Sequence, residues 1–260
     1  MPCGKCPPCL ARVVNGWAFR ISVEQRTAFT SLFVTLTYAT GRVPITTGSK
    51  GHAMSLRKTD VQKFMKRLRK IEQGNNSIKY FAVGEYGSKG ERPHYHAIIF
   101  NANRENIERA WALDNKKIGE IHIGNVTDAS IVYTLKYMCK HMRIKKDDPY
   151  GREREFRLMS KGMGEAYVSD QMKKWHLADP VERMYIPLKD GKKVAMPRYY
   201  KDRIYNEKQR GIIAAAQRVR LNKEDEKIRA EVENYELHMM NVKEAQYKKH
   251  EYRSKTRQKI

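Results

Sequence analysis

The pattern of hydrophobic and polar positions first predicts a strand and then an amphipathic helix. Leu32–Tyr38 is dense in β-branched and aromatic residues and leads into a stretch with Gly and Pro, which is typical of a strand that ends in a loop. Thr59 stands three residues before Gln62, the spacing of a capping box, and apolar residues then recur at helical spacing as far as Gly74. These apolar residues are Val61, Phe64, Leu68 and Ile71.

Two further strands are predicted in the middle of the chain, at Ile78–Tyr86 and His94–Phe100. The residues between them are polar and rich in Gly, which favours a loop. We therefore expect an antiparallel hairpin with a long connection.

The next segment predicts a short helix at Glu105–Leu113, a strand at Ile118–Ile123 and a helix at Asp128–Met142. Strands that alternate with helices and include a hairpin indicate an α+β fold, with helices packed on one face of a sheet rich in antiparallel strands. The apolar side of the last helix consists of Val132, Leu135, Cys139 and Met142.

The pattern is weaker after residue 150, and it places no element between residues 150 and 205. Residues 206–260 contain no Pro and one Gly, and charges of both signs interrupt the apolar positions there. Such a segment is typical of a solvated helix or a partly disordered tail. We expect a domain of residues 1–205 with a Cys-rich N-terminus, followed by a charged helical or partly disordered extension of residues 206–260.

The charge of the chain indicates a polyanionic partner. Lys and Arg number 52 against 29 Asp and Glu, a formal net charge of +23. Such charge binds phosphates without selecting a sequence, so it identifies the class of partner only. The basic side of the helix before Gly74 is a candidate DNA-binding surface, although a charge run is usually only a solvated face. Its candidate residues are Lys63, Lys66, Arg67 and Lys70.

His94 and His96 form a candidate metal site. Residues i and i+2 of a strand lie on the same face, so their two imidazoles would lie side by side. Glu85, across the expected hairpin, would add a carboxylate ligand. This set suits Mg²⁺ or Mn²⁺ better than a closed thiolate site for zinc. The alternative is that the histidines are structural, because His-x-His also occurs in strands by chance.

Tyr133 and Tyr137 form a candidate nucleophilic pair. Residues four apart on a helix share one face, and a lysine follows each tyrosine by three residues, at Lys136 and Lys140. A phenol needs a nearby cation or a polarised target before it attacks a phosphodiester. The alternative is that both tyrosines only pack against the helix surface.

Cys3, Cys6 and Cys9 are too closely spaced for a disulfide framework and fit a reducing compartment. Their C-x-x-C-x-x-C spacing could instead place three thiolates around a structural Zn²⁺. The alternative is a flexible N-terminus with free thiols. No apolar run is long enough to cross a membrane and no secretory leader opens the chain, so we expect a cytosolic protein without a membrane partner.

Three ordered motifs resemble those of the HUH endonuclease superfamily, named for histidine, bulky residue, histidine. They are Phe33-Val-Thr-Leu-Thr-Tyr38, Arg92-Pro-His-Tyr-His-Ala-Ile-Ile-Phe100, and Tyr133-x-x-x-Tyr137 with Lys140. One position departs from the superfamily, because Tyr95 stands between the histidines where an aliphatic residue is usual.

Three other motifs make the resemblance narrower. Pro2-Cys-Gly-Lys-Cys6, Gly84-Glu-Tyr-Gly87 and Met196-Pro-Arg-Tyr-Tyr200 are similar to those of the replication initiation proteins of gokushovirus-type microviruses, small phages with circular single-stranded DNA. The resemblance covers most of residues 1–205.

The resemblance implies a rolling-circle replication initiator that nicks and joins single-stranded DNA at the viral origin. It implies metal ligands at Glu85, His94 and His96, and a covalent 5′-phosphotyrosine at Tyr133 or Tyr137. Lys140 and Lys136 would orient the phosphate. The chain has no Gly-x-x-x-x-Gly-Lys-[Ser/Thr] motif, so the expected partners include a host helicase as well as a host DNA polymerase, in the bacterial cytoplasm.

Two other functions remain open at this point. A relaxase or transposase of the same superfamily would share the chemistry and differ in its substrate. A non-catalytic basic protein that binds nucleic acid would use the histidines and tyrosines only for packing.

Overall fold

The computed structural model describes residues 3–4, 6–74, 77–88, 90–114, 116–137, 144–188 and 191–256, without the side chains of residue 250 and residues 253–256. The chain divides into two compact units. One unit is Arg20–Gly164, and the other combines Met1–Phe19 with Glu165–Ile260. The expected boundary between residues 205 and 206 stays a prediction.

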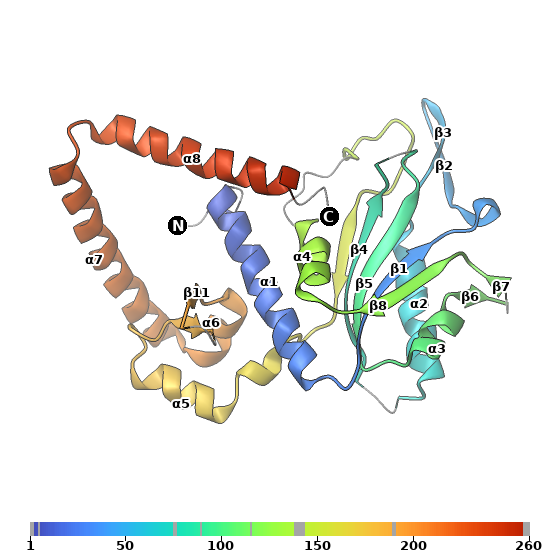
Figure 1. Cartoon of the computed structure of the whole chain (residues 1–260), viewed down its shortest axis with the longest axis horizontal. Coiled ribbons are helices and arrows are strands. Elements are labelled where there is room, and N and C mark those ends of the chain that lie inside the picture. The colour runs from blue at the N-terminus through green and yellow to red at the C-terminus, as the bar shows by residue number, and fades with distance from the viewer. Residues whose placement is uncertain are drawn as a thin grey trace. The chain divides into compact units, whose positions relative to one another are not determined.

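The centre of the Arg20–Gly164 unit is a five-stranded sheet in the order β8-β1-β5-β4-β9 (Figure 1). Each neighbouring pair in it is antiparallel. This arrangement confirms the predicted α+β class with an antiparallel sheet. The strands are β1 (Ser31–Thr37), β4 (Lys79–Tyr86), β5 (Pro93–Phe100), β8 (Ile121–Asn125) and β9 (Phe156–Met159).

One face of the sheet packs against α2 (Lys58–Ile71) and α3 (Arg104–Ala110) and forms the main hydrophobic core. Val61, Phe64, Met65 and Leu68 are the buried residues of α2. Their spacing puts them on one stripe of the helix, which explains why the stripe could be predicted from the sequence. Tyr95 and Trp111 are completely buried in the same core.

The opposite face of the sheet carries α4 (Asp128–Lys136). Rings of α4 contact His96, whereas Tyr95, the neighbouring residue of β5, contacts Trp111 in the main core. Adjacent strand residues point to opposite faces, so the helices cover both faces. The expectation that helices pack on one face only was therefore wrong. Residues 138–142, the end of the helix predicted for this segment, lie outside the described residues.

The N-terminus of α2 also differs from the prediction, because Thr59 does not cap the helix. The N-cap is Arg57, and its own side chain makes no capping hydrogen bond. The backbone N–H of Arg57 instead donates to the hydroxyl of Tyr95 (2.9 Å), and that of Lys58 donates to the carboxylate of Glu153 (2.7 Å). Tertiary partners thus satisfy donors that a capping box would otherwise have served.

Short elements complete the Arg20–Gly164 unit. A hairpin of β2 (Ile45–Gly48) and β3 (Gly51–Met54) follows η1 (Thr40–Arg42), and β6 (Ala112–Leu113) pairs with β7 (Lys116–Lys117).

The second unit is mainly helical and contains residues 165–205, most of the segment for which the sequence predicted no element; β9, in the rest of that segment, belongs to the first unit. Helix α1 (Pro7–Thr27) begins in the second unit, and His176 is completely buried there, bonded to the hydroxyl of Tyr167 (3.0 Å) and the carbonyl of Arg183 (2.7 Å). Its other elements are η2 (Glu165–Tyr167), α5 (Asp170–Ala178), β10 (Tyr185–Pro187), β11 (Lys193–Ala195), α6 (Arg198–Ile204), α7 (Glu207–Glu231) and α8 (Tyr235–Thr256).

The long helices α7 and α8 confirm the predicted charged helical extension. Asn206 and Gln209 form a capping box at the start of α7. Among the described residues, no helix combines the length and apolar character that a membrane crossing requires.

Candidate active site

The pairing of β4 with β5 places one carboxylate beside two imidazoles. Glu85 lies directly opposite His94 in the register, and His96 is two residues farther along the same face of β5. Oε1 of Glu85 lies 2.8 Å from Nε2 of His94 and 3.0 Å from Nε2 of His96. One oxygen therefore contacts both rings. Glu85 and His96 are buried, and the His94 side chain is about one fifth exposed.

The other ring nitrogen of each histidine is held by a further partner. Nδ1–H of His94 donates to the carbonyl of Arg92 (3.1 Å), and Nδ1 of His96 is hydrogen-bonded to the hydroxyl of Thr35 (3.0 Å). Such outer partners fix the ring orientation of metal-binding histidines. Thr35 was not a candidate from the sequence, and only the register of β1 with β5, in which it faces His96, identifies it.

These contacts test whether the group suits a cation. A neutral His94 that donates from Nδ1 presents a lone pair at Nε2, which faces a carboxylate oxygen at 2.8 Å. Two lone pairs at this distance require a proton or a metal ion between them. The ligand atoms of Glu85, His94 and His96 all lie within 4.8 Å of one another. Two nitrogens and one carboxylate therefore fit a divalent ion with open positions.

Helix α4 directs both tyrosines toward this group. The hydroxyl of Tyr137 donates to Oε1 of Glu85 (2.6 Å), and the hydroxyl of Tyr133 lies 3.4 Å from Nε2 of His96. The rings of Tyr133 and Tyr137 contact each other edge to face, with centroids 5.6 Å apart. Phe33 of β1 stacks on His96 and meets Tyr133 edge-on, so it packs beneath both groups. A capping box of Thr127 and Ser130 fixes the start of the helix.

Lys136 lies with the tyrosines. Its Nζ is 4.0 Å from the centre of the Tyr133 ring and 5.1 Å from that of Tyr137, which are cation–π distances. Lys140, the other predicted lysine, lies outside the described residues.

Burial and hydrogen bonding act in opposite directions on the pKa values in this group. Burial by itself would raise the pKa of Glu85, but its close contacts with His94, His96 and Tyr137 more than offset this effect and hold the pKa below its usual range. Burial raises the pKa of the Tyr137 phenol, and the neighbouring Glu85 carboxylate raises it further. Burial also raises the pKa of Tyr133 and lowers that of His96. The carboxylate thus stays ionised, whereas both phenols stay protonated.

Tyr95, the residue between the histidines, points away from the site into the main core. Its hydroxyl lies 2.6 Å from that of Tyr38 and accepts from the backbone N–H of Arg57. Tyr95 therefore connects β5, which carries the histidines, to the start of α2. An aliphatic residue would fill the same space but could not make these hydrogen bonds.

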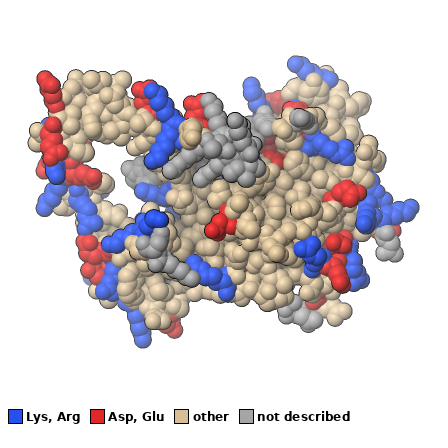
Figure 2. All heavy atoms as spheres, in the orientation of Figure 1, with Lys and Arg blue, Asp and Glu red and all other residues tan. Residues whose placement is uncertain are grey.

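The basic residues predicted to bind DNA lie across the sheet from the histidines and tyrosines, on α2. Lys63, Lys66 and Lys70 are exposed. Arg67 is partly buried, and its Nε donates to the carbonyl of Ala110 (2.7 Å), which joins α2 to α3. The structure does not bring this surface together with the candidate site. On the face drawn in Figure 2, basic and acidic side chains are interspersed rather than gathered into one basic patch.

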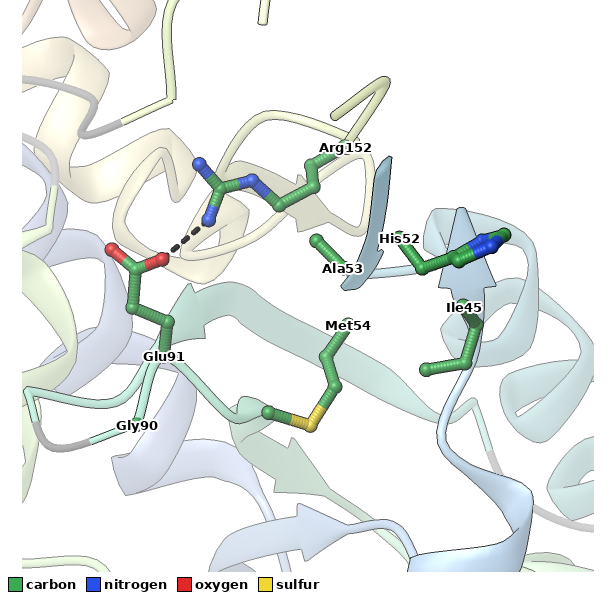
Figure 3. Close-up of a pocket in the computed structure, with 7 residues that line it drawn as sticks. All are labelled: Ile45, His52, Ala53, Met54, Gly90, Glu91 and Arg152. Carbon is green, nitrogen blue, oxygen red and sulfur yellow. Dashed lines mark hydrogen bonds and ion pairs between the residues drawn. The ribbon is translucent and has the colours of Figure 1, made fainter. Parts of the chain in front are cut away.

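A pocket of about 340 Å³ lies beside the β2–β3 hairpin (Figure 3). Residues of the hairpin face Gly90 and Glu91, in the loop between β4 and β5, and the ion pair of Glu91 with Arg152 closes one side. None of the candidate residues lines it. The pocket therefore adds no group to the candidate site.

The three predicted zinc ligands also lie together. The sulfur atoms of Cys3, Cys6 and Cys9 are within 4.8 Å of one another at the start of α1. They belong to the second unit and are a separate group from Glu85 and the histidines.

Comparisons with known proteins agree with the motifs. The family model described as replication-associated protein ORF2/G2P matches residues 31–142, which include β1, β4, β5 and α4. The replication-associated protein ORF2 of Spiroplasma virus 4 is 29% identical over 225 residues, which cover 80% of this chain and 68% of the relative.

Two other relatives carry similar names. The replication-associated protein VP4 of Bdellovibrio phage phiMH2K is 27% identical, over 77% of this chain and 66% of its own length. The replication-associated protein ORF4 of Chlamydia phage 1 is 25% identical, over 78% of this chain and 53% of its own length. The chain thus spans between about half and two thirds of these relatives. No solved structure matches the chain significantly.

Proposed function

We propose, from the premise that this chain is a relative of the replication-associated proteins of microviruses, that it initiates rolling-circle replication by nicking and joining single-stranded DNA at the viral origin. One observation carries the proposal. Oε1 of Glu85 contacts both imidazoles and the hydroxyl of Tyr137, and the hydroxyl of Tyr133 lies 3.4 Å from Nε2 of His96, so both tyrosine hydroxyls lie at the candidate metal ligands.

Glu85, His94 and His96 would hold one Mg²⁺ or Mn²⁺. When bound, such an ion offsets the negative charge that develops on a phosphate during transfer. Thr35 and the carbonyl of Arg92 keep the two imidazoles turned toward the shared position. Burial of Glu85 and His96 limits competition from water at this position.

The tyrosines supply the nucleophile. A phenol oxygen forms a bond to the phosphorus as its proton is lost to solvent, and the bond from phosphorus to the 3′ oxygen breaks. That oxygen takes up a proton and becomes a free 3′-hydroxyl, while the 5′-phosphate stays on the protein. The phosphodiester is exchanged rather than hydrolysed, so rejoining needs no nucleotide cofactor. A second tyrosine within reach permits a second cleavage while the first strand is still attached.

Lysines at the site would bind the phosphate. Lys136 lies over both tyrosine rings, and Lys140 follows it by four residues in the sequence. Lys145 and Lys146 are exposed and lie soon after the lysines of this segment in the sequence. They would extend the basic surface that contacts the DNA backbone.

The proposed partners follow from this chemistry. The substrate is the single-stranded origin of the viral DNA. A host helicase would separate the strands, since the sequence has no P-loop motif, and a host polymerase would extend the 3′-hydroxyl in the cytoplasm of the bacterial host.

A covalent trapping experiment tests the proposal. Purified protein is incubated with labelled single-stranded viral DNA and Mn²⁺, and the products are separated under denaturing conditions. We expect a protein-linked product with the wild type and with Tyr247→Phe, an exposed tyrosine of α8, and none with the double variant Tyr133→Phe, Tyr137→Phe. His94→Ala with His96→Ala should abolish cleavage yet leave most of the DNA affinity, which depends on many Lys and Arg contacts. An adduct on any other residue would overturn the assignment, and binding without cleavage by the wild type would favour a non-catalytic DNA-binding protein.

A further inference from the structure

A second group of metal-ligand side chains lies at the N-terminus, apart from the proposed active site. Cys3 is exposed, and Cys6 and Cys9 are partly buried. The three sulfur atoms lie within 4.8 Å of one another, and those of Cys3 and Cys9 are 4.0 Å apart. No disulfide joins them.

The separation of the sulfur atoms agrees with tetrahedral zinc. A Zn–S bond is about 2.3 Å, so two thiolates on one tetrahedral ion lie about 3.8 Å apart. The Cys3–Cys9 distance of 4.0 Å is close to this value and about twice the length of an S–S bond. Small movements would therefore bring all three sulfur atoms to one ion.

One backbone donor lies beside the cysteine sulfur atoms. The N–H of Cys6 donates to the sulfur of Cys3 (3.2 Å). Such a bond offsets negative charge on that sulfur atom.

The dipole of helix α1 also favours negative charge on the cysteine sulfur atoms. Cys6 directly precedes the helix, and the N–H of Leu10 closes its first turn on the carbonyl of Cys6 (3.0 Å). The positive end of the helix dipole therefore lies beside the sulfur atoms. Pro7 and Pro8 at the start of α1 fix the backbone that holds Cys6 and Cys9 in position.

We propose that Cys3, Cys6 and Cys9 bind one Zn²⁺ as three thiolates. Three Zn–S bonds form as three thiol protons pass to solvent, and water or a nitrogen or oxygen donor from outside this trio fills the fourth position. Soft thiolates select Zn²⁺ over the Mg²⁺ or Mn²⁺ proposed for Glu85 and the histidines. The ion fixes the segment before α1 to the first turn of the helix. This proposal is independent of the proposed nuclease function, because the two groups share no residue.

Metal analysis of the full chain, expressed without a histidine tag, tests this proposal. We expect about one zinc per chain in the wild type, and loss of most of it when Cys3, Cys6 or Cys9 is changed to Ser. Cys139→Ser is the matched control, because it removes a thiol outside the trio and should leave the zinc in place. Far-ultraviolet circular dichroism checks that each variant keeps its helices.

A second measurement does not depend on variants. Wild-type protein stripped of metal and loaded with Co²⁺ should show the near-ultraviolet charge-transfer band of cobalt thiolates. Three results would overturn the proposal: wild-type protein that contains no zinc and gives no cobalt band, equal zinc loss in Cys139→Ser, or iron with visible absorption, which would indicate an iron–sulfur cluster.

Discussion

Oε1 of Glu85 accepts a 2.6 Å hydrogen bond from the hydroxyl of Tyr137, while the hydroxyl of Tyr133 lies 3.4 Å from Nε2 of His96. The two tyrosines therefore approach the same group from different sides and contact different members of it. One is held on the carboxylate, and the other lies beside an imidazole. This difference in position suggests that the two phenols are not interchangeable.

Single phenylalanine variants should separate the two tyrosines. Phe removes the phenol oxygen and keeps the ring, so the packing of Tyr133 against Phe33 and Tyr137 should survive. We expect Tyr133→Phe and Tyr137→Phe each to retain some nicking or joining of oligonucleotides but to release no unit-length circles in a full replication reaction. The products are read on gels that separate circles from linear strands. Normal circle release by both single variants would refute the use of two nucleophiles.

Replacement of Glu85 should weaken metal binding without removing the histidines. We expect Glu85→Gln to raise the Mn²⁺ concentration needed for half-maximal cleavage by at least about tenfold, since even outer-shell partners of metal ligands are worth 10–100-fold. Glu108→Gln, an exposed carboxylate on α3, is the charge-matched control. The measurement is cleavage rate against Mn²⁺ concentration. Superimposable curves for Glu85→Gln and the wild type would remove Glu85 from the set of ligands.

The hydroxyl of Tyr95 should contribute to stability. Tyr95→Phe removes the hydrogen bonds to the N–H of Arg57 and to Tyr38, whose hydroxyl keeps its bond to Asp60, and a hydrogen bond is worth about 0.5–1.5 kcal/mol. We expect the free energy of unfolding in urea to fall by about this amount, and that of the exposed control Tyr247→Phe to stay the same. A double-mutant cycle with Tyr38→Phe should show coupling. Additive effects would mean that the two hydroxyls do not interact.

Two glycines near β8 should respond differently to alanine. A Cβ at Gly119 would lie 2.1 Å from the backbone oxygen of Thr37, whereas a Cβ at Gly124 would meet nothing within 4 Å. Because a backbone oxygen cannot move aside cheaply, we expect Gly119→Ala to destabilise by about 1–3 kcal/mol. Gly124→Ala should change stability by less than about 1 kcal/mol. Urea unfolding of both variants measures this difference, and equal effects would contradict the close approach at Gly119.

The sequence by itself determined those features that depend on local periodicity. The alternation of a strand put His94 and His96 on one face, and the turn of a helix put Tyr133 and Tyr137 on another. The same periodicity predicted β1, α2, β4 and β5 close to their observed bounds. These features require only neighbours two to four residues away.

The tertiary structure decided which of these local faces meet. Tyr137 reaches Glu85 across 52 residues of sequence, and Thr35 reaches His96 across 61, so no local pattern could pair them. Long-range partners also replaced the expected cap of α2, because Tyr95 and Glu153 bind the N–H groups at its start. The basic side of α2 lies across the sheet from the histidines for the same reason: periodicity shows which residues share a face, and packing alone determines where that face lies.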